Sequence, residues 1–371
     1  MLLNYKHFLS KIGVKYPIIQ APMAGVSTPK MAANVAMHGG IGSLPVSGIN
    51  FTQEEAISKL ETLLNTCQTV YASNNLNINF FCHKKVSKPT TAEIENWLQL
   101  YSKIPGIGNN NLLSTQINFM DDINVSFMEL ESSPQKLEKL MTFLKNKYTP
   151  KFVSFHFGAP GKSTIKKFQD IGILVLVTAT SLQEAIELIS LNVDGIICQG
   201  YEAGGHRGNF DPSVLDENLP TYILFDQIKK YLNTINEPKF LIAAGGIISS
   251  KDARYYIDNG ASAVQMGTAF LFTSDCTVNY DNCKYTTVMT PLVSGKPARA
   301  MLTPFIENLL LNYEHEKLPP YSYMYAAFKQ LRALYPDKIN FNLVGSNYKN
   351  CLQWIGKSSG DLIEIVGKNV I

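Results

Sequence analysis

The chain has 371 residues, of which 45% are apolar and 17% are charged, and its 33 basic and 30 acidic side chains give a formal net charge of +3. This composition supplies a large hydrophobic core and excludes a disordered or fibrous chain. The basic excess is small and no Lys/Arg run occurs, which argues against a protein that binds nucleic acid.

The first ten residues mix apolar and polar side chains and lack the uninterrupted apolar stretch of a signal peptide. No window of the sequence approaches the ~20 apolar residues needed to span a bilayer. The six cysteines are scattered without a C-x-x-C pair, a pattern typical of reduced, mostly buried thiols rather than of disulfides or a zinc site. We therefore expect a cytoplasmic protein with no membrane partner.

Short apolar segments rich in Ile, Val and Phe alternate with amphipathic segments from residue 17 to residue 272. Several of these segments are nearly continuous apolar runs, which favours parallel strands buried on both faces. Eight strands are expected, at residues 17–21, 40–44, 77–81, 152–157, 174–178, 195–199, 241–244 and 263–266.

Two of the intervening helices carry clear end signals. Ser181 and Glu184 have the spacing of a capping box, in which the hydroxyl accepts a backbone N–H and the glutamate reaches back, and the helix is expected to run to about residue 192. Another helix is expected to begin at Ser250 and to end at Asn259-Gly260, because glycine readily adopts the left-handed conformation that ends helices.

Eight strands separated mainly by helices predict an α/β protein with a (β/α)8 TIM barrel, although strand count alone leaves an open doubly wound sheet as the alternative. The connection after the third strand, residues 82–151, is oversized and should form local structure, including a helix over about 134–148, or cover a site. After residue 272 the alternation stops. We predict a barrel over residues 1–272 that includes this insert, and a smaller, mainly helical C-terminal domain, residues 273–371, over the barrel mouth.

Glycine-rich turns follow the last two predicted strands, which end in Ala243-Ala-Gly-Gly-Ile247 and in Gln265-Met-Gly-Thr-Ala269. Barrel enzymes often bind phosphate at these two places, where glycine lets backbone N–H groups approach an anion and a helix N-terminus adds a favourable dipole. A tight turn without a ligand is the alternative for each loop alone. Two such loops on adjacent strands favour a phosphate site, with Thr268 as a hydroxyl donor.

The densest motif follows the sixth strand and reads Gln199-Gly-Tyr-Glu-Ala-Gly-Gly-His-Arg-Gly-Asn-Phe210. Its glycines create a backbone-rich pocket beside His206, whose imidazole ordinarily gains or loses a proton near neutral pH. The alternative is a histidine that only braces the turn. A metal site is not expected, because Glu202 and His206 lie on an irregular loop and no third ligand is specified.

Other polar and apolar groups also fall at strand ends. The amides of Gln199 and Asn79 suit the edge of a heterocycle, or equally an internal hydrogen bond at the end of a strand. The first strand ends in Gln20-Ala-Pro-Met-Ala-Gly25, where Met23 offers a polarizable surface for a flat ring or simply packs in the core.

The segment Ser154-Phe-His-Phe-Gly158 ends the fourth strand. Strand alternation places Ser154 and His156 on one face and the two phenylalanines on the other, so His156 either binds an anionic substrate group or is a satisfied barrel histidine. Lys296 and Arg299 form a further cationic pair, which the sequence favours as part of a solvated surface turn.

Together these motifs resemble the nitronate monooxygenase family, formerly called 2-nitropropane dioxygenases, from residue 17 to about residue 305. The resemblance rests on five motifs found in order at strand ends, a set far more specific than any single member. They are Gln-Ala-Pro-Met-Ala-Gly at 20–25, Ser-Phe-His-Phe-Gly at 154–158, Gln-Gly-Tyr-Glu-Ala-Gly-Gly-His-Arg-Gly at 199–208, Ala-Ala-Gly-Gly-Ile at 243–247 and Gln-Met-Gly-Thr-Ala-Phe at 265–270.

The resemblance implies a TIM barrel that holds one non-covalent FMN and a smaller domain over the mouth. It implies that His206 is the catalytic residue, as a base on a neutral nitroalkane or by placing the nitronate, and that His156 lines the substrate pocket. It further implies that the following residues bind FMN: Ala21, Pro22, Met23, Asn79, Gln199, Gly204, Gly205, Gly245, Gly246, Gln265, Met266, Gly267 and Thr268. No motif is matched in 82–151 or beyond about 306, and the first motif continues Ala24-Gly25-Val26-Ser27, where many members have a second glycine before the valine.

The implied reaction is the oxidation of an alkyl nitronate by FMN and O2 to a carbonyl compound and nitrite, with a detoxifying role, in a monomer or homodimer. The nearest alternative is an FMN- and NAD(P)H-dependent enoyl-acyl-carrier-protein reductase, which shares the barrel and a similar Gly-Gly-His turn. The segment 154–158 favours the monooxygenase. A non-catalytic flavin-binding barrel is a further alternative, because one barrel fold hosts many functions.

Overall fold

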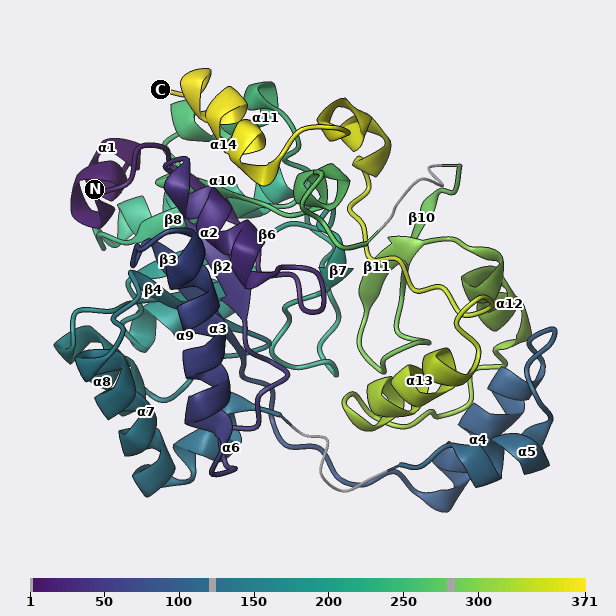
Figure 1. Cartoon of the computed structure of the whole chain (residues 1–371). Helices are drawn as coiled ribbons and strands as arrows, with labels where there is room; N and C mark the ends of the chain where they lie inside the picture. Colours follow the sequence, from purple (N-terminus) through teal and green to yellow (C-terminus); the bar gives the residue numbers. More distant parts are fainter. Residues whose placement is uncertain (1–2, 120–124, 279–283) are drawn as a thin grey trace.

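The computed structural model describes residues 3–119, 125–278 and 284–371. An eight-stranded parallel sheet surrounded by helices forms its larger part (Figure 1). All eight predicted strands are confirmed, with ends that differ by no more than a few residues. Their bounds are β1 Ile18–Gln20, β2 Gly42–Pro45, β3 Leu76–Phe81, β4 Phe152–His156, β5 Leu174–Ala179, β6 Gly195–Gln199, β8 Phe240–Ala244 and β9 Ala263–Met266.

The sheet closes into a barrel. Its strand order is β1-β9-β8-β6-β5-β4-β3-β2, and every neighbouring pair is parallel. The two end strands meet through a parallel bridge between Ile19 and Ile41. There the N–H of Gln20 donates to the carbonyl of Ile41 at 2.9 Å, and the N–H of Ile41 donates to that of Ile18 at 2.9 Å. The (β/α)8 TIM barrel is therefore confirmed over the open sheet.

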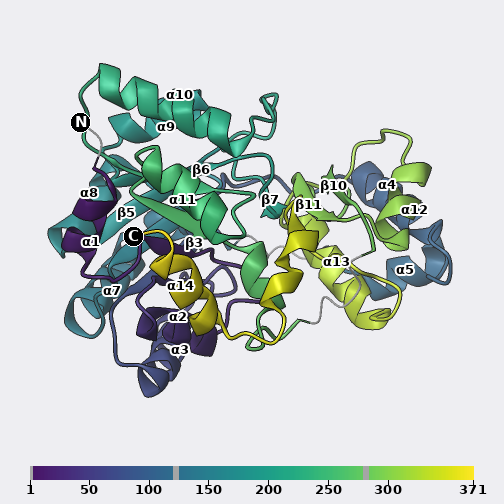
Figure 2. The same cartoon turned by 90° about the horizontal axis from the view of Figure 1, so that it is seen from above.

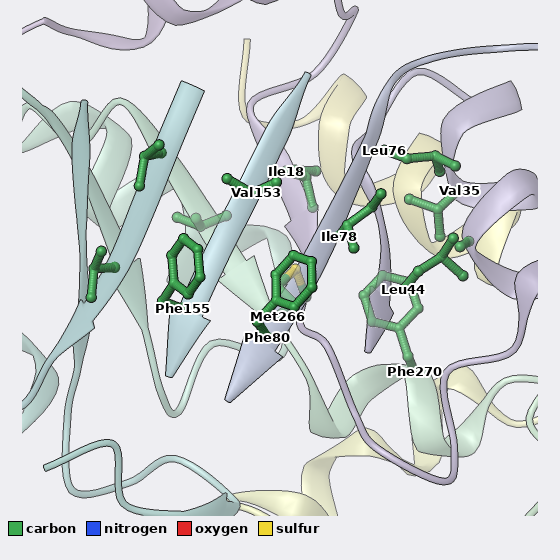
Figure 3. Packing of buried hydrophobic residues seen from close by; sticks show 14 of the residues in the cluster. Ile18, Val35, Leu44, Leu76, Ile78, Phe80, Val153, Phe155, Met266 and Phe270 are labelled. Carbon is green, nitrogen blue, oxygen red and sulfur yellow. The ribbon is translucent and has the colours of Figure 1, made fainter. Parts of the chain in front are cut away.

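Helices cover the outside of the barrel, because alternate residues of each strand turn apolar side chains outward. Figure 3 shows part of this outer core, where Phe80 of β3 lies beside Phe155 of β4, with ring centroids 5.6 Å apart. The covering helices are α2 Pro29–Met37, α3 Ala56–Val70, α6 Phe127–Glu131, α7 Pro134–Asn146, α8 Lys162–Asp170, α9 Leu182–Ser190, α10 Thr221–Thr234 and α11 Ser250–Asp258.

The barrel interior is apolar at one end and polar at the other. Helix α1 (Tyr5–Ile12) closes the N-terminal end, where the ring of Phe8 meets those of Phe152 and Phe240 at 5.8 and 5.5 Å. Toward the carboxyl ends of the strands the inward positions become polar, at Asn79, Ser154, Thr178, Gln199 and Gln265. The carboxyl end is therefore the end that is built to bind a polar ligand, as in other barrels.

The predicted helix ends are found, with one correction. At α9 the Ser181 hydroxyl accepts the N–H of Glu184, but the glutamate does not return to Ser181. Its carboxylate instead accepts the N–H groups of Thr180 at 2.6 Å and of Phe210 at 2.8 Å, so it ties the helix to the loop after β6. Helix α11 begins at Ser250 as predicted and ends before Gly260, whose φ is +97°.

A second hydrophobic core lies beside the barrel, where Figures 1 and 2 both show the same group of elements at one end of the molecule. It combines α4 (Thr91–Ser102) and α5 (Asn110–Gln116) of the insert with α12 (Pro304–Asn312) and α13 (Tyr323–Leu334). A three-stranded antiparallel sheet completes it, formed by β10 (Thr287–Thr290), β11 (Ala298–Met301) and β7 (Gly205–His206). These short strands were not predicted from the sequence.

The chain then returns to the barrel. After the short helix η1 (Thr268–Phe272) and the second core, η2 (Tyr348–Trp354) and α14 (Ser359–Lys368) pack on the barrel's outer core. The Trp354 indole N–H donates to the carbonyl of Ile248 at 2.9 Å. Side chains of the insert pack in the second core, and α14 packs on the first. The domain boundary at residue 272 stays a prediction. No helix in the described ranges has the length and apolar composition needed to span a bilayer.

We expect Gly42→Ala to destabilise the barrel. A methyl group at Gly42 would lie 2.0 Å from the backbone oxygen of Ala32, which belongs to the helix packed on β2. Overpacking of this kind costs about 1–3 kcal/mol in the free energy of unfolding, measured by urea denaturation. Gly48→Ala is the matched control, because a methyl group there meets nothing within 4 Å. Equal stability of the two variants would contradict the close packing of β2 against α2.

Candidate active site

The predicted glycine-rich turns converge at the carboxyl ends of the strands. A methyl group at Gly267, after β9, would lie 3.3 Å from the Cβ of Ala21 and 3.9 Å from the Sδ of Met23, after β1. A methyl group at Gly245, after β8, would lie 3.1 Å from the N–H nitrogen of Ala203, after β6. Four of the predicted motifs therefore meet in one place.

The backbone at this place adopts conformations that only glycine tolerates easily. Gly245 and Gly246 have φ values of +117° and +71°, which side chains rarely adopt. Ala21, Pro22 and Met23 are partly exposed at the end of β1. The result is a cradle of main-chain atoms with few side chains in it.

A segment that the sequence interpretation missed completes this cradle. The N–H of Gly345 donates to the Thr268 hydroxyl at 2.9 Å, and Gly204 lies so close to Gly345 that a methyl group at Gly204 would be 2.5 Å from its nitrogen. The Asn347 amide donates to the carbonyl of Gly246 at 3.4 Å. Since Thr268 accepts from Gly345, its own proton remains available to an anion. Residues 344–347 were missed because no motif was matched beyond about 306.

His206 is held by a hydrogen bond from the C-terminal region. Its Nε2 lies 2.9 Å from the hydroxyl of Ser294, which is fully buried. That hydroxyl donates its single proton to the carbonyl of Lys296 at 3.1 Å and accepts the N–H of Lys296 at 3.3 Å. With its proton on that carbonyl, the hydroxyl accepts from His206; this arrangement assigns the ring proton to Nε2 and leaves Nδ1 without a hydrogen-bond partner among the described residues.

The structure brings His156, Gln199 and His206 together, as predicted. The His156 Nε2–H donates to the carbonyl of His206 at 3.2 Å, and the Gln199 amide donates to the same carbonyl at 3.0 Å. The amide oxygen of Gln199 accepts the N–H of Gly208 at 2.7 Å. Both ends of the Gln199 amide thus form hydrogen bonds within its own loop. This is the internal strand-end hydrogen bonding that the sequence analysis gave as the alternative to a contact with a heterocycle. Its contact with a cofactor stays a prediction.

The two histidines are neutral at pH 7. Burial, reinforced by the neighbouring His156 and Lys296, lowers the pKa of His206 to about 3. Burial also lowers the pKa of His156 to about 4, against the opposing effect of its hydrogen bond to the His206 carbonyl. Desolvation penalises the charged imidazolium, so it moves the pKa of His206 below the neutral range in which an imidazole ordinarily titrates.

An aromatic cluster centres on Phe157, whose φ is +73°. The predicted alternation would point this ring away from His156, but the left-handed backbone ends the strand and turns the ring inward. The Phe157 ring lies 4.4 Å from that of His156, 5.9 Å from that of His206 and 5.3 Å from that of Tyr321. Tyr325 of α13 is 5.6 Å from His206. Neither tyrosine was singled out from the sequence, because its segment matched no motif.

The interpretation of Lys296 and Arg299 as a solvated surface turn is wrong. Lys296 is only 3% exposed, and its Nζ lies 4.6 Å from the centre of the Phe157 ring. Arg299 is 7% exposed and donates from Nε and Nη2 to the carbonyl of Tyr201 at 3.0 and 2.7 Å. The loop after β6 covers both side chains, which no local pattern in 294–299 could reveal.

A buried histidine and a buried arginine were also missed. His83, at the start of the insert, lies 5.1 Å from the ring of Tyr321, and burial lowers its pKa to about 4. Arg207 is 1% exposed and forms a bidentate ion pair with Asp216 at 2.7 and 3.0 Å. It also donates to the carbonyls of Gln199 and Gly200, so it fixes the loop that presents His206.

Two side-chain amide oxygens at the strand ends are left to accept hydrogen bonds, which suits the N–H edge of a bound heterocycle. The Gln265 side-chain oxygen is buried without a hydrogen-bond partner among the described residues, an arrangement that a bound donor would satisfy. Asn79 donates to the carbonyl and hydroxyl of Ser154, so its amide oxygen is the atom left to accept. The Met266 side chain packs in the outer core, so only its backbone faces the site. In the described part of the chain, no group of three His, Cys, Asp or Glu could hold a metal ion.

Comparisons with known proteins agree with this geometry. The sequence model of the family described as nitronate monooxygenase matches residues 6–362. A Saccharomyces cerevisiae protein, named only provisionally as a nitronate monooxygenase, is 44% identical over 93% of this chain and 88% of its own length. The nitronate monooxygenase of Paraburkholderia phytofirmans is 35% identical over 80% of this chain and 76% of its own length.

A solved structure supports the fold. The nitroalkane oxidase from Streptomyces ansochromogenes superposes with a TM-score of 0.77 over 98% of this chain and 97% of its own, at 23% identity. At that identity the likeness establishes the barrel and the second core beside it, and no residue roles are carried over from it.

We expect Ser294→Ala to remove the preference of His206 for the Nε2–H form. The hydroxyl is the acceptor that fixes this tautomer, so its loss should leave a mixture of both. Nitrogen NMR of ¹⁵N-histidine-labelled protein distinguishes the protonated from the unprotonated ring nitrogens. Ser10→Ala, on the exposed face of α1, is the control and should leave the His206 signals unchanged. A protonated Nδ1 in the unsubstituted protein would overturn the assignment.

Proposed function

Because the chain belongs to the nitronate monooxygenase family and is an oxidoreductase that oxidises nitronates, we propose that it uses FMN and O2 to convert alkyl nitronates to a carbonyl compound and nitrite. The observation that carries the proposal is the placement of a neutral His206, whose Nδ1 has no partner among the described residues, on the same Phe157 ring as the buried Lys296 and near a backbone cradle for phosphate. A detoxifying role, a cytoplasmic location and a monomeric or homodimeric state remain predictions.

The proposed FMN site follows the converging loops. Gly245, Gly246, Gly267 and Thr268 would hold the phosphate, while the backbone of residues 21–23 would face the ring. Amide and backbone groups along the cradle would complete the site, at Asn79, Gln199, Gly204, Gly205, Gln265 and Met266. When bound, the flavin supplies the redox chemistry between nitronate and oxygen. The protein supplies binding, orientation and the exclusion of water.

The state of His206 favours the nitronate over the neutral nitroalkane as substrate. A base whose conjugate acid has a pKa of about 3 removes a proton poorly from a nitroalkane C–H, which is a far weaker acid. A nitronate has already lost that proton and requires no such transfer. We therefore assign to His206 the placing of the nitronate, with His156 as part of the pocket wall.

The shape of the cluster supports a small substrate. The rings of Tyr321, Tyr325 and Phe341 lie 5.8, 5.6 and 6.4 Å from that of His206. Such close aromatic walls suit a short alkyl nitronate better than the long acyl chain that an enoyl-acyl-carrier-protein reductase must accommodate.

The direct test is the anaerobic visible spectrum of the purified protein. We expect FMN absorbance, and we expect it to bleach on mixing with propyl nitronate and to remain on mixing with NADH. Admission of O2 should restore the colour and yield nitrite in proportion to the nitronate consumed. Bleaching by NADH with indifference to nitronate would instead indicate the reductase. A colourless protein that binds no added FMN would contradict both functions.

We expect His206→Asn to retain FMN and to lose about 100-fold in kcat/KM for propyl nitronate, the cost of a misplaced substrate. FMN should remain because the phosphate cradle does not include this side chain. His7→Asn makes the same substitution on the exposed face of α1 and should leave kcat/KM unchanged. Full turnover by an FMN-loaded His206→Asn variant would remove His206 from its proposed role.

A further inference from the structure

We propose that Lys296 is the anion-recognition residue of this site, and that its ammonium group binds a nitro oxygen of the nitronate. The inference deepens the proposed function and rests on it for the identity of the anion. Lys296 lies in the turn between β10 and β11, so the charge is contributed by the second core to a site otherwise formed by barrel loops.

The ammonium group is buried with little to compensate its charge. Lys296 is 3% exposed, and the carboxylates that raise its pKa, Glu184 and Asp211, act on it only through space. Its hydrogen bond to the carbonyl of Asn209, at 3.3 Å, uses one of three donors. Buried charges are normally paired, because leaving water is costly for them. Two donors therefore remain for an anion that enters the site.

The ammonium group of Lys296 and the imidazole of His206 contact the same two aromatic rings. The Nζ of Lys296 lies 4.6 Å from the centre of the Phe157 ring and 6.0 Å from that of Tyr321. The same two rings meet the imidazole of His206, at 5.9 and 5.8 Å. The Ser294 hydroxyl also joins His206 to the backbone of Lys296. The ammonium and the imidazole thus share one aromatic platform.

The nearest acidic groups do not form a competing pair. Glu184 accepts the N–H groups of Thr180 and Phe210. Asp211 accepts from Ser213 and lies 3.8 Å from the exposed Lys84. Both act on Lys296 only through space, so neither forms an ion pair that a substrate would have to displace. The hydrogen bond to Asn209 holds the ammonium group in place. A fixed charge of this kind binds an anion without reorganisation.

The chemistry of the ligand follows from that single charge. A nitronate carries one negative charge shared by two oxygens, and either oxygen can accept from an ammonium. A neutral nitroalkane gains much less from the same contact. Nitrite, the proposed product, and nitrate, an inert analogue, share the planar anionic oxygens, so both should bind at Lys296.

The test uses the FMN-loaded protein with Lys296→Met and Lys296→Arg. We expect Lys296→Met to raise the KM for propyl nitronate and the Kd for nitrate, read from the flavin absorbance, by about tenfold or more, since a charge-assisted hydrogen bond is lost. The effect on kcat should be smaller, and Lys296→Arg should retain most of the affinity. Lys84→Met, at a side chain that is 71% exposed, is the matched control and should change neither constant.

The pH dependence gives a second test that needs no variant. Burial lowers the pKa of Lys296 to about 8, so the ammonium loses its proton as the pH rises through that value. We expect nitrate affinity to fall from pH 7 to pH 9.5, and to be flat in Lys296→Met. Other titratable groups face Lys296 from the surrounding elements: His83, His156, His206, Tyr321, Glu184 and Asp211. The histidine pKa values are lowered and that of Tyr321 is raised, so these groups do not titrate near pH 8. Burial also lowers the pKa of Lys329, which acts on His206, and the flat profile expected of Lys296→Met separates the two lysines.

Two results would overturn the inference: unchanged KM and nitrate Kd in Lys296→Met, or a nitrate Kd of the unsubstituted protein that is constant from pH 7 to 9.5. Either would reduce Lys296 to a packing role on Phe157. The two proposals fail separately. Nitrate binding that depends on Lys296, without nitronate turnover, would refute the proposed function and support the anion site. Nitronate turnover that is unchanged in Lys296→Met would support the proposed function and refute the anion site.

Discussion

The backbone turn at Phe157 is the constraint on which the site depends. A non-glycine residue at φ +73° costs of order 1–3 kcal/mol, which is tolerated only where surrounding contacts over-determine it. Here the reversed direction buries the ring to 1% exposure and makes it a platform for histidines, a tyrosine and an ammonium. Gly158 follows at φ +142°, where a methyl group would lie 2.7 Å from the carbonyl of Cys82. A continued strand would have sent the ring outward to join Phe155, and the platform would be absent.

The second core completes this platform. His206 belongs to a barrel loop by sequence, but it pairs with Ala298 of β11 in the antiparallel sheet and bonds to Ser294. The turn between β10 and β11, which carries Ser294, is held in turn by the insert, because the Tyr101 hydroxyl of α4 donates to the carbonyl of Leu292 at 2.9 Å. The long connection after β3 therefore contributes indirectly to the orientation of His206, through the strand ends that hold Ser294 and Lys296.

The sequence predicted what local patterns encode. Apolar runs identified all eight strands, and the glycines around His206 and at 245–246 located the loops that meet. What it could not predict depends on contacts between distant segments. Gly-Lys-Pro at 295–297 has the local character of an exposed turn, and only the loop after β6 and the ring of Phe157 bury Lys296. The cradle segment 344–347 and the tyrosines of the second core were missed for the same reason.

Desolvation assigns the electrostatic roles within the site. His83, His156 and His206 are each held neutral chiefly by burial, and the charge of Lys296 disfavours their protonation further. Lys296 keeps its proton at pH 7, because the pKa of a lysine starts high enough that burial lowers it only to about 8. The same apolar surroundings thus keep the three histidines neutral and leave Lys296 charged at pH 7. A site with a buried positive charge at Lys296 and no strong base is matched to a substrate that arrives already deprotonated, which is the chemical difference between a nitronate and its parent nitroalkane.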